Sequence, residues 1–271
     1  MTYDETGLAG RVADQLDAAG RTDQLTTADT GLLDQYHAGG VDAVDKLIDS
    51  LGLRPGDALI DVGSGFGGPA RRIAEKTGAT VLGVDITAPY VETAQMLTQR
   101  TGLGDLVTFR HGDVMNFVPG RLFDAAITMH VQMNLADKVE WFAAIADVLA
   151  PGAKLGIWEV CLNDPERDPA WPMPWSLDGS DSHLVTPDEL RKAITSAGFR
   201  MVEWSDETPW VTQWAATLGT RSTPVAGLVL PMLLDDGITR VVNLANALED
   251  GGLAVVRGMF MKPDADGVHT R

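Results

Sequence analysis

Cysteine, basic residues and long apolar runs are all scarce in this sequence of 271 residues. The single cysteine, Cys161, excludes a disulfide within the chain and favours a reducing, cytoplasmic setting. No run of about eighteen apolar residues occurs, so no membrane span is predicted. Only 21 Lys and Arg stand against 38 Asp and Glu, which gives a formal net charge of −17. Because this charge repels phosphates, we expect neither nucleic acid nor an anionic membrane as a partner.

The length and the apolar content indicate one folded unit with a packed core. Hydrophobic residues make up 45% of the chain, and 271 residues suit one large α/β domain with a small cap. The first five residues are acidic and carry no apolar segment, so no signal peptide is expected. Leu8, Val12 and Leu16 recur four residues apart, which predicts a short amphipathic helix near the N-terminus.

A glycine-rich turn stands between a strand-like and a helix-like stretch. Residues 58–60 are apolar and short, which suits a buried parallel strand, and a helix is predicted from Pro69. Glycines let a ligand approach the backbone closely, and free amides at the helix N-terminus then face that ligand. A site for a nucleotide-like cofactor is therefore predicted at Asp61-Val62-Gly63-Ser64-Gly65-Phe66-Gly67-Gly68.

Two classes of cofactor compete for this turn. Gly63, Gly65 and Gly68 match the Gly-x-Gly-x-x-Gly dinucleotide fingerprint, and Asp85 follows about twenty residues later, as that fingerprint expects. Asp61 favours the other class, because a carboxylate two residues before the first glycine would repel a pyrophosphate. The same carboxylate would attract S-adenosylmethionine, which carries an ammonium and a sulfonium but no phosphate.

Two segments carry a resemblance to a known family. Asp61-x-Gly63-x-Gly65-x-Gly67 resembles the first motif of the class I S-adenosylmethionine-dependent methyltransferases, and later motifs follow in order up to Gly198. The run Asp34-Gln35-Tyr36-His37-x-Gly39-Gly40 resembles a lid segment in one branch that acts on small molecules. The resemblance implies S-adenosyl-L-methionine as cofactor, S-adenosyl-L-homocysteine as its product and a small-molecule acceptor.

The apolar pattern after the turn alternates between strand and helix. Strands are predicted at 58–61, 80–84, 107–110, 123–129, 154–160, 199–205 and 253–261, and helices at 69–77, 89–101, 136–149 and 187–197. This alternation predicts a doubly wound, mostly parallel seven-stranded sheet, and the resemblance implies that 253–261 is an antiparallel strand inserted at its edge. The predicted units are a helical arm and lid (1–52), a Rossmann-like core (53–206), a mostly helical cap (207–250) and the completing strand (251–271).

Cofactor contacts are predicted at the carboxyl ends of successive strands, where open α/β sheets bind ligands. The first strand ends at Asp61 and the glycine turn, including Ser64, which would hold the amino-acid part of the cofactor. The second ends at Asp85 and Ile86, which would bind the ribose hydroxyls and pack on the adenine. After the third, Asp113 and Val114 would contact the adenine. The alternative for Asp85 and Asp113 is a helix N-cap.

Histidine is the natural candidate for catalysis. Transfer of an already activated methyl needs positioning and, where the acceptor arrives protonated, a base. His130 follows the fourth predicted strand and resembles a His found there in several small-molecule methyltransferases; the alternative is a residue that only lines the cofactor pocket. Tyr36 and His37 are the second candidates, for contact with the sulfonium, as base or as substrate anchor. The alternative for Tyr36 and His37 is that they only cap a surface helix, ahead of the two glycines that follow.

The chain after the fifth predicted strand supplies candidates for the acceptor pocket. Clustered tryptophans suit a flat, aromatic or cationic acceptor, and the residues predicted to bind it are Trp175, His183 and Trp210. Core packing or a homodimer interface is the alternative for the tryptophans. The spacing of the histidines and the lone Cys161 predict no metal site.

The leading hypothesis is a cytoplasmic methyltransferase that acts on a small metabolite, namely an aromatic or heterocyclic specialised metabolite. Analogy with the lid branch favours methylation on carbon or nitrogen over oxygen. One rival is a cyclase or isomerase that keeps the methyltransferase fold but transfers no methyl group. A second rival is a binding module without enzymatic activity.

Overall fold

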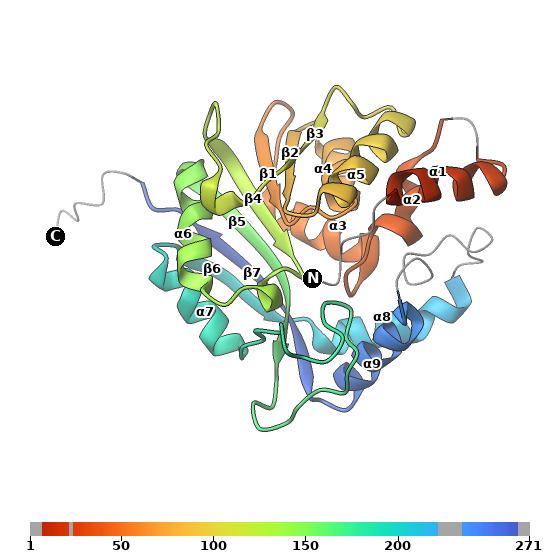
Figure 1. Cartoon of the computed structure of the whole chain (residues 1–271). Coiled ribbons are helices and arrows are strands. Elements are labelled where there is room, and N and C mark those ends of the chain that lie inside the picture. The colour runs from red at the N-terminus through yellow and green to blue at the C-terminus, as the bar shows by residue number, and fades with distance from the viewer. Residues whose placement is uncertain (1–6, 22–23, 222–234, 265–271) are drawn as a thin grey trace.

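The computed structural model describes residues 7–21, 24–221 and 235–264. One seven-stranded sheet has the strand order β3-β2-β1-β4-β5-β7-β6 (Figure 1). Its strands are β1 (Ala58–Val62), β2 (Thr80–Asp85), β3 (Val107–His111), β4 (Phe123–Met129), β5 (Leu149–Leu162), β6 (Arg200–Asp206) and β7 (Leu253–Met261). Neighbours from β3 to β5 pair in parallel, and β7 pairs antiparallel with both β5 and β6.

The predicted fold class is confirmed, and the position of the last strand needs one correction. The sequence led us to expect β7 at the edge of the sheet, but it lies between β5 and β6, so that β6 forms the edge. The burial of the two strands explains this order. β7 is apolar and nearly all buried, whereas residues 200–203 of β6 are exposed. A strand buried on both faces needs a hydrogen-bonded neighbour on each side.

Helices cover both faces of the sheet (Figure 1). α6 (Lys138–Val148) and α7 (Pro187–Ser196) pack on one face, around Phe142 and Ile194. The other face is covered by α3 (Gly40–Leu51), α4 (Gly68–Thr77), α5 (Ala88–Arg100), α8 (Thr208–Arg221) and α9 (Gly237–Glu249). Local signals set the ends of these helices. For example, the Asp137 side chain accepts from the Glu140 amide and so begins α6 after the predicted start at residue 136.

Two helices precede the core. α1 (Leu8–Ala18) is the predicted amphipathic helix, and its buried residues Leu8, Val12 and Leu16 pack with Leu97 of α5. α2 (Thr27–Asp34) begins with a capping box, in which the side chains of Thr26 and Asp29 each accept from the backbone amide of the other. Two short 3₁₀ turns, η1 (Val114–Asn116) and η2 (Gln132–Asn134), follow β3 and β4.

A buried ion pair attaches α2 to the core. Arg71 of α4 is 0% exposed, and its Nη2 lies 2.8 Å from Asp34 Oδ2 and 2.6 Å from the Phe66 carbonyl oxygen. Nη1 donates to the carbonyl of Ala94 and to the hydroxyl of Thr98 on α5. Arg71 therefore joins the end of α2, the glycine turn, α4 and α5 at one point.

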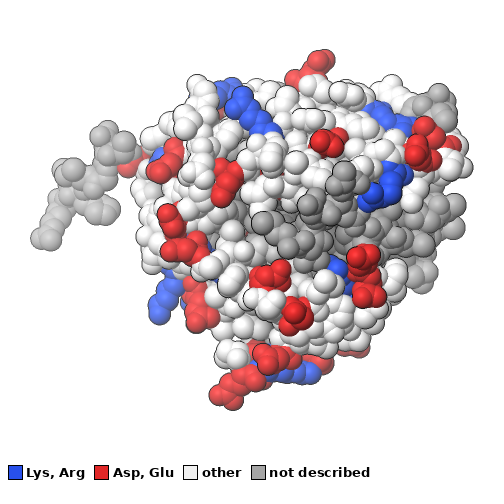
Figure 2. All heavy atoms as spheres, in the orientation of Figure 1, with Lys and Arg blue, Asp and Glu red and all other residues white. Residues whose placement is uncertain are grey.

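The segment 209–249, predicted to be mostly helical, contains α8 and α9; residues 222–234 lie outside the described residues. Within the described chain, none of the helices combines the length and apolar character that a membrane span requires. Figure 2 shows acidic side chains scattered over the visible face with Lys and Arg between them, and the described atoms of that face form no continuous basic area.

Breaking the buried pair should cost far more stability than breaking an exposed one. We expect Asp34→Ala to lower the free energy of unfolding by about 3–5 kcal/mol, because Arg71 is left charged and uncompensated in the interior. Asp45→Ala is the control, since Asp45 pairs with the half-exposed Arg72; its cost should stay below about 1 kcal/mol. Urea denaturation measures both. Equal losses in the two variants would show that Arg71 does not depend on Asp34.

Candidate active site

A cavity of about 590 Å³ opens at the carboxyl ends of β1, β2 and β4, as expected for ligand sites in open α/β sheets. The glycine turn and the residues that follow β2, β3 and β4 form its walls. Tyr36 and His37, which follow α2, line it as well. Asp181 and His183 line the cavity too, so it brings together residues from six separate segments, including every predicted cofactor residue except Gly67.

The glycines of the turn serve different purposes. Gly63, Gly65 and Gly67 have φ angles of 79°, 52° and 78°, in the left-handed region that favours glycine. A Cβ at Gly63 would collide with Val131, and one at Gly67 with Phe109, so these two permit close packing. A Cβ at Gly65 would meet nothing within 4 Å, and this residue lines the cavity. Gly65 therefore leaves open space where a ligand can approach the backbone.

Two polar side chains beside this turn have no hydrogen-bond partner among the described residues. Asp61 is 2% exposed, and its Oδ2 is buried and unpaired. Ser64 Oγ is buried and unpaired as well. Burial, together with the nearby Asp85 and against the opposing charge of Arg71, raises the pKa of Asp61 to about 8. An acid kept in this state has strong affinity for a cation or for hydrogen-bond donors.

Asp85 connects the glycine turn with the start of α5. Its Oδ2 accepts from the Gly65 amide at 2.8 Å, and its Oδ1 accepts from the Thr87 amide at 2.9 Å. The N-cap of α5 is Thr87, so the N-cap alternative does not describe Asp85. Ile86 beside it is 61% exposed and lines the cavity. A large apolar side chain open to a cavity is suited to pack on a flat ring.

For Asp113, in contrast to Asp85, the N-cap alternative describes the side chain. Its Oδ1 accepts from the Met115 amide at 3.0 Å and caps η1, which is the N-cap alternative. Asp113 and the buried Val114 both line the cavity all the same. The cap leaves the second carboxylate oxygen of Asp113 available for a ligand.

The lid segment supplies two buried polar side chains. The Tyr36 hydroxyl is buried without a partner among the described residues, and burial raises the pKa of Tyr36 to about 12. His37 Nε2 lies 3.0 Å from the carbonyl oxygen of Gly40. Because a carbonyl only accepts, Nε2 donates and Nδ1 remains as the acceptor. Burial lowers the pKa of His37 to about 4, against the effect of that bond, so its ring is neutral at pH 7.

His130 lies opposite the lid, where β4 ends. Its φ is +56°, which is uncommon for any residue but glycine, and its backbone amide donates to the Trp158 carbonyl at 2.9 Å. His130 Nε2 is buried and has no partner among the described residues. The rings of His37 and His130 meet edge to face with 6.2 Å between centroids. Burial, followed by the charge of His37, lowers the pKa of His130 to about 3, so it is neutral at pH 7.

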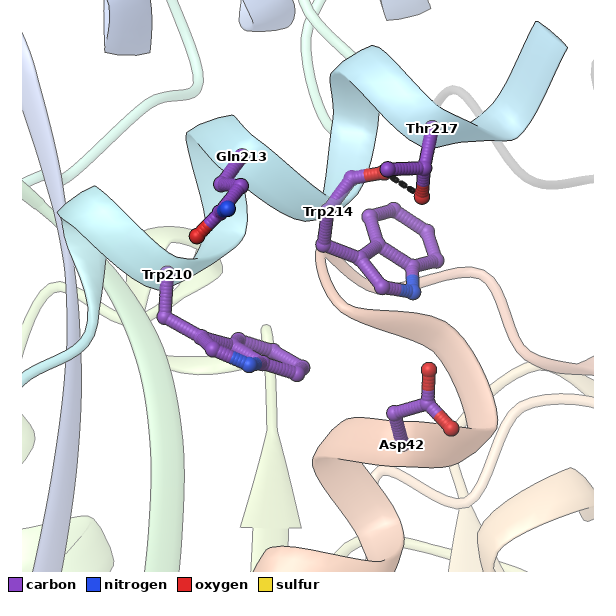
Figure 3. Close-up of a pocket in the computed structure, with 5 residues that line it drawn as sticks. All are labelled: Asp42, Trp210, Gln213, Trp214 and Thr217. Carbon is purple, nitrogen blue, oxygen red and sulfur yellow. Dashed lines mark hydrogen bonds between the residues drawn. The ribbon is translucent and has the colours of Figure 1, made fainter. Parts of the chain in front are cut away.

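The predicted acceptor-binding residues are not brought together. His183 lines the cavity, whereas Trp175 is 3% exposed and donates to the Ser182 hydroxyl. Trp210 lines a separate cavity of about 170 Å³, where it and Trp214 project from α8 toward Asp42 of α3 (Figure 3). Lys46 Nζ lies 4.1 Å from the centroid of the Trp210 ring. Core packing thus accounts for Trp175, and contact with α3 for Trp210.

Several cavity residues were missed by sequence reasoning, and their charge is informative. Asp34 and Asp181 line the cavity but were not predicted as site residues; Asp34 stands in the lid segment, so its motif could have indicated it. No Lys or Arg is found among the described lining residues. Seven carboxyl groups line the cavity: Asp34, Asp61, Asp85, Asp113, Asp137, Glu140 and Asp181. In the described part of the chain, no three His, Cys, Asp or Glu side chains are grouped as metal ligands.

Fold and cavity together define a class, the α/β proteins that bind a nucleoside cofactor at the end of the sheet. Residues 60–157 match the family model of the methyltransferase domain. Methyltransferase phqN of Penicillium fellutanum is 31% identical over 60% of this chain and 54% of its own. Residues 60–157 thus carry a methyltransferase domain. It spans about half the length of the curated relatives it matches.

Solved structures share the fold. The [4+2]-cyclase SpnF superimposes with a TM-score of 0.65 at 22% identity, over 97% of this chain and 98% of its own. Phosphoethanolamine N-methyltransferase 2 of Haemonchus contortus, in complex with S-adenosyl-L-methionine, gives 0.68 at 19% identity, over 93% of this chain and 60% of that one.

The buried acid of the glycine turn should make stability depend on pH. The pKa of Asp61 is raised in the folded chain from 3.8 to about 8, so the folded state holds this proton more tightly than the unfolded state. Its contribution to stability is therefore full below about pH 4 and is lost as the pH rises to about 8. We expect Asp61→Asn to unfold at higher temperature than the unsubstituted chain at pH 8. This gap in unfolding temperature should narrow toward pH 5. Asp105→Asn, at an exposed carboxylate, is the control; a gap for Asp61→Asn that does not change with pH would contradict the prediction.

Proposed function

We propose that this protein transfers a methyl group from S-adenosyl-L-methionine to a small metabolite. The observation that carries the proposal is the charge of the cavity, which has seven carboxyl groups and, among its described lining residues, no Lys or Arg. A dinucleotide would place its pyrophosphate against these groups, which is repulsive, whereas a ligand with an ammonium and a sulfonium is attracted. Asp61 Oδ2 and Ser64 Oγ fit the same ligand, because neither has a hydrogen-bond partner among the described residues and each can accept from a donor or bind a cation.

The residues present fit this cofactor from end to end. We assign its amino-acid part to Asp61, Gly63, Ser64 and Gly65, with Gly67 shaping the turn from behind. Its ribose belongs to Asp85, and its adenine to Ile86, Asp113 and Val114. When bound, the cofactor supplies a methyl group that is already activated for transfer. The chain then has to hold the acceptor in line, exclude water and receive a proton.

His130 is the residue we assign to that proton. Its Nε2 is buried and unpaired, whereas His37 already uses its Nε2 on the Gly40 carbonyl. Burial lowers the pKa of His130, so it is a weak base that takes a proton most readily from an acceptor that turns cationic on methylation. We favour carbon or nitrogen over oxygen as the attacked atom, by analogy with the branch that the lid segment resembles. Tyr36 and His37 then close the site from the lid side.

The same proposal divides the chain into units and suggests where the acceptor binds. We assign residues 53–206 and 251–271 to the cofactor-binding core, 1–52 to the arm and lid, and 207–250 to the cap. We propose His183, an exposed residue that lines the cavity, as the contact for the acceptor. An aromatic or heterocyclic metabolite without anionic groups suits a cavity of this charge.

One rival function has an observation in its favour. SpnF, described as a [4+2]-cyclase, matches this fold over 97% of the chain. A cyclase on this fold would keep the cavity and the cofactor residues but would leave the mass of its substrate unchanged by any methyl group. Product mass separates the two functions.

Calorimetry and product mass test the proposal. We expect S-adenosyl-L-methionine and S-adenosyl-L-homocysteine to bind and nicotinamide dinucleotides not to bind. Affinity for the cationic cofactor should rise with pH up to about 8, because binding favours the ionised form of Asp61, and Asp61→Asn should remove that rise. Converted acceptors should gain the mass of one methyl group. Tight binding of a dinucleotide alone would overturn the proposal, and a product formed without the cofactor and without added mass would support the cyclase.

Removing the proposed base should separate turnover from binding. We expect His130→Ala to lower turnover on the order of 10²-fold or more, the usual contribution of a positioned acid or base. Its Kd for S-adenosyl-L-homocysteine should change far less. Asp61→Asn is the paired variant with the opposite signature, a larger loss in cofactor affinity than in turnover at saturation. Equal losses in both quantities for His130→Ala would reduce His130 to a residue that only lines the cavity.

A further inference from the structure

Three consecutive residues of β5 hold the turn that carries His130. The carbonyl of Trp158 accepts from the His130 amide at 2.9 Å. The next residue, Glu159, accepts through Oε2 from the amides of Val131 at 3.0 Å and Gln132 at 3.3 Å. The carbonyl of Val160 accepts from the Gln132 side chain. These bonds from β5 all end on residues 130–132, the turn between β4 and η2.

Glu159 is the only side chain of β5 in this set, and its surroundings make an acid unexpected there. It is 0% exposed, and its Oε1 lies 3.2 Å from the hydroxyl of Thr128. The charged and titratable groups that face it are Lys138 and Cys161. Lys138 Nζ donates to the carbonyls of Leu135 and His183, and the described residues offer Glu159 no ion pair. Packing alone would favour an apolar residue at such a position.

The bonds to Glu159 fall where the backbone needs them. His130 has a φ of +56°, a conformation that is unfavourable for a residue with a side chain and persists only when its neighbours enforce it. The amides of the next two residues donate to Glu159, and without it they would have no acceptor among the residues that the structure describes. Val131 packs in the space that Gly63 leaves free, so the same turn also touches the glycine turn.

We propose that Glu159 is a positioning residue, which holds the 130–132 turn and with it the place of His130 in the wall of the cavity. It acts through His130 and does not line the cavity itself. The inference deepens the proposed function and rests on it for the effect on turnover, but not for the effect on the turn.

The carboxyl group also gives the turn a response to pH. Burial raises the pKa of Glu159 to about 8, against the bonds from Gln132, Val131 and Thr128 and the charge of Lys138. Above that pH Glu159 carries a negative charge at the oxygen that accepts from the amide of Val131, the residue after His130, and an opposite charge favours the protonated imidazole. His130 thereby becomes a stronger base, so turnover should rise as Glu159 ionises. Asp61 titrates in the same range, but its effect is confined to cofactor affinity and vanishes at saturation.

Two substitutions at this position separate the hydrogen bonds from the charge. Glu159→Gln keeps an oxygen for the Val131 and Gln132 amides but cannot ionise, whereas Glu159→Ala removes both. We expect Glu159→Ala to lower turnover at saturating cofactor about tenfold or more, the scale of a misplaced catalytic group, with little change in the Kd for S-adenosyl-L-homocysteine. Glu159→Gln should keep turnover at pH 7 but lose the rise near pH 8. Glu249→Gln, at an exposed position on α9, is the matched control.

Amide hydrogen exchange tests the turn without any turnover. The Val131 and Gln132 amides should exchange faster in Glu159→Ala and at the unsubstituted rate in Glu159→Gln. Normal protection in Glu159→Ala would overturn the inference whether or not the chain transfers methyl groups. Equal losses of turnover and product affinity in Glu159→Ala would overturn it too, as a general loss of structure. If protection changes as expected while the unsubstituted chain methylates nothing, the positioning of the turn stands and the proposed function falls.

Discussion

The ion pair between Asp34 and Arg71 is the contact on which the site depends. It is fully buried, and Arg71 also donates to the Phe66 carbonyl inside the glycine turn. The position of the lid and the shape of the cofactor turn are therefore fixed by one guanidinium. Gly68 completes this junction, because the backbone of Asp34 occupies the space that any other residue there would need for its Cβ. The third glycine of the dinucleotide-like pattern thus permits the close attachment of α2.

The electrostatics of the cavity explain how a strongly acidic chain can bind a nucleoside. The net charge of −17 is not only a matter of solubility, because seven carboxyl groups gather around one cavity. Mutual repulsion and burial keep some of them protonated, as the raised pKa of Asp61 shows. A cationic ligand lets them ionise, so that binding and proton release are coupled. The neutral histidines opposite the turn add no positive charge to oppose this ligand.

Most of the fold could be predicted from the sequence, because strand and helix periods alternate clearly and glycines mark the turns. The order of β6 and β7 could not be predicted, because it depends on which of the two strands is covered on both faces in the folded chain. In the site, Asp85, Ile86 and Val114 were placed by a general rule on strand ends. The positions of Trp175 and Trp210 could not be predicted in this way, because aromatic composition does not show which ring faces a cavity and which faces a neighbouring helix.

Long-range contacts account for the other misses. Arg71 reads as an ordinary helix residue in the sequence, and Glu159 as an interruption in an apolar strand. Their partners lie 37 residues away for Arg71 and 28 residues away for the bond between Glu159 and Val131. For Glu159 the available signal was an acid in a mostly apolar strand, which indicates that a partner exists without indicating which one.

The contact between the lid segment and α8 has a consequence for how this scaffold can be re-engineered. Gly39 and Gly40 lie against the rings of Trp210 and Trp214 so closely that no side chain would fit between them. A chimaera that takes α8 from another chain of this fold must import the matching residues 39–40 with it. The two regions, far apart in the chain, form a single exchangeable module.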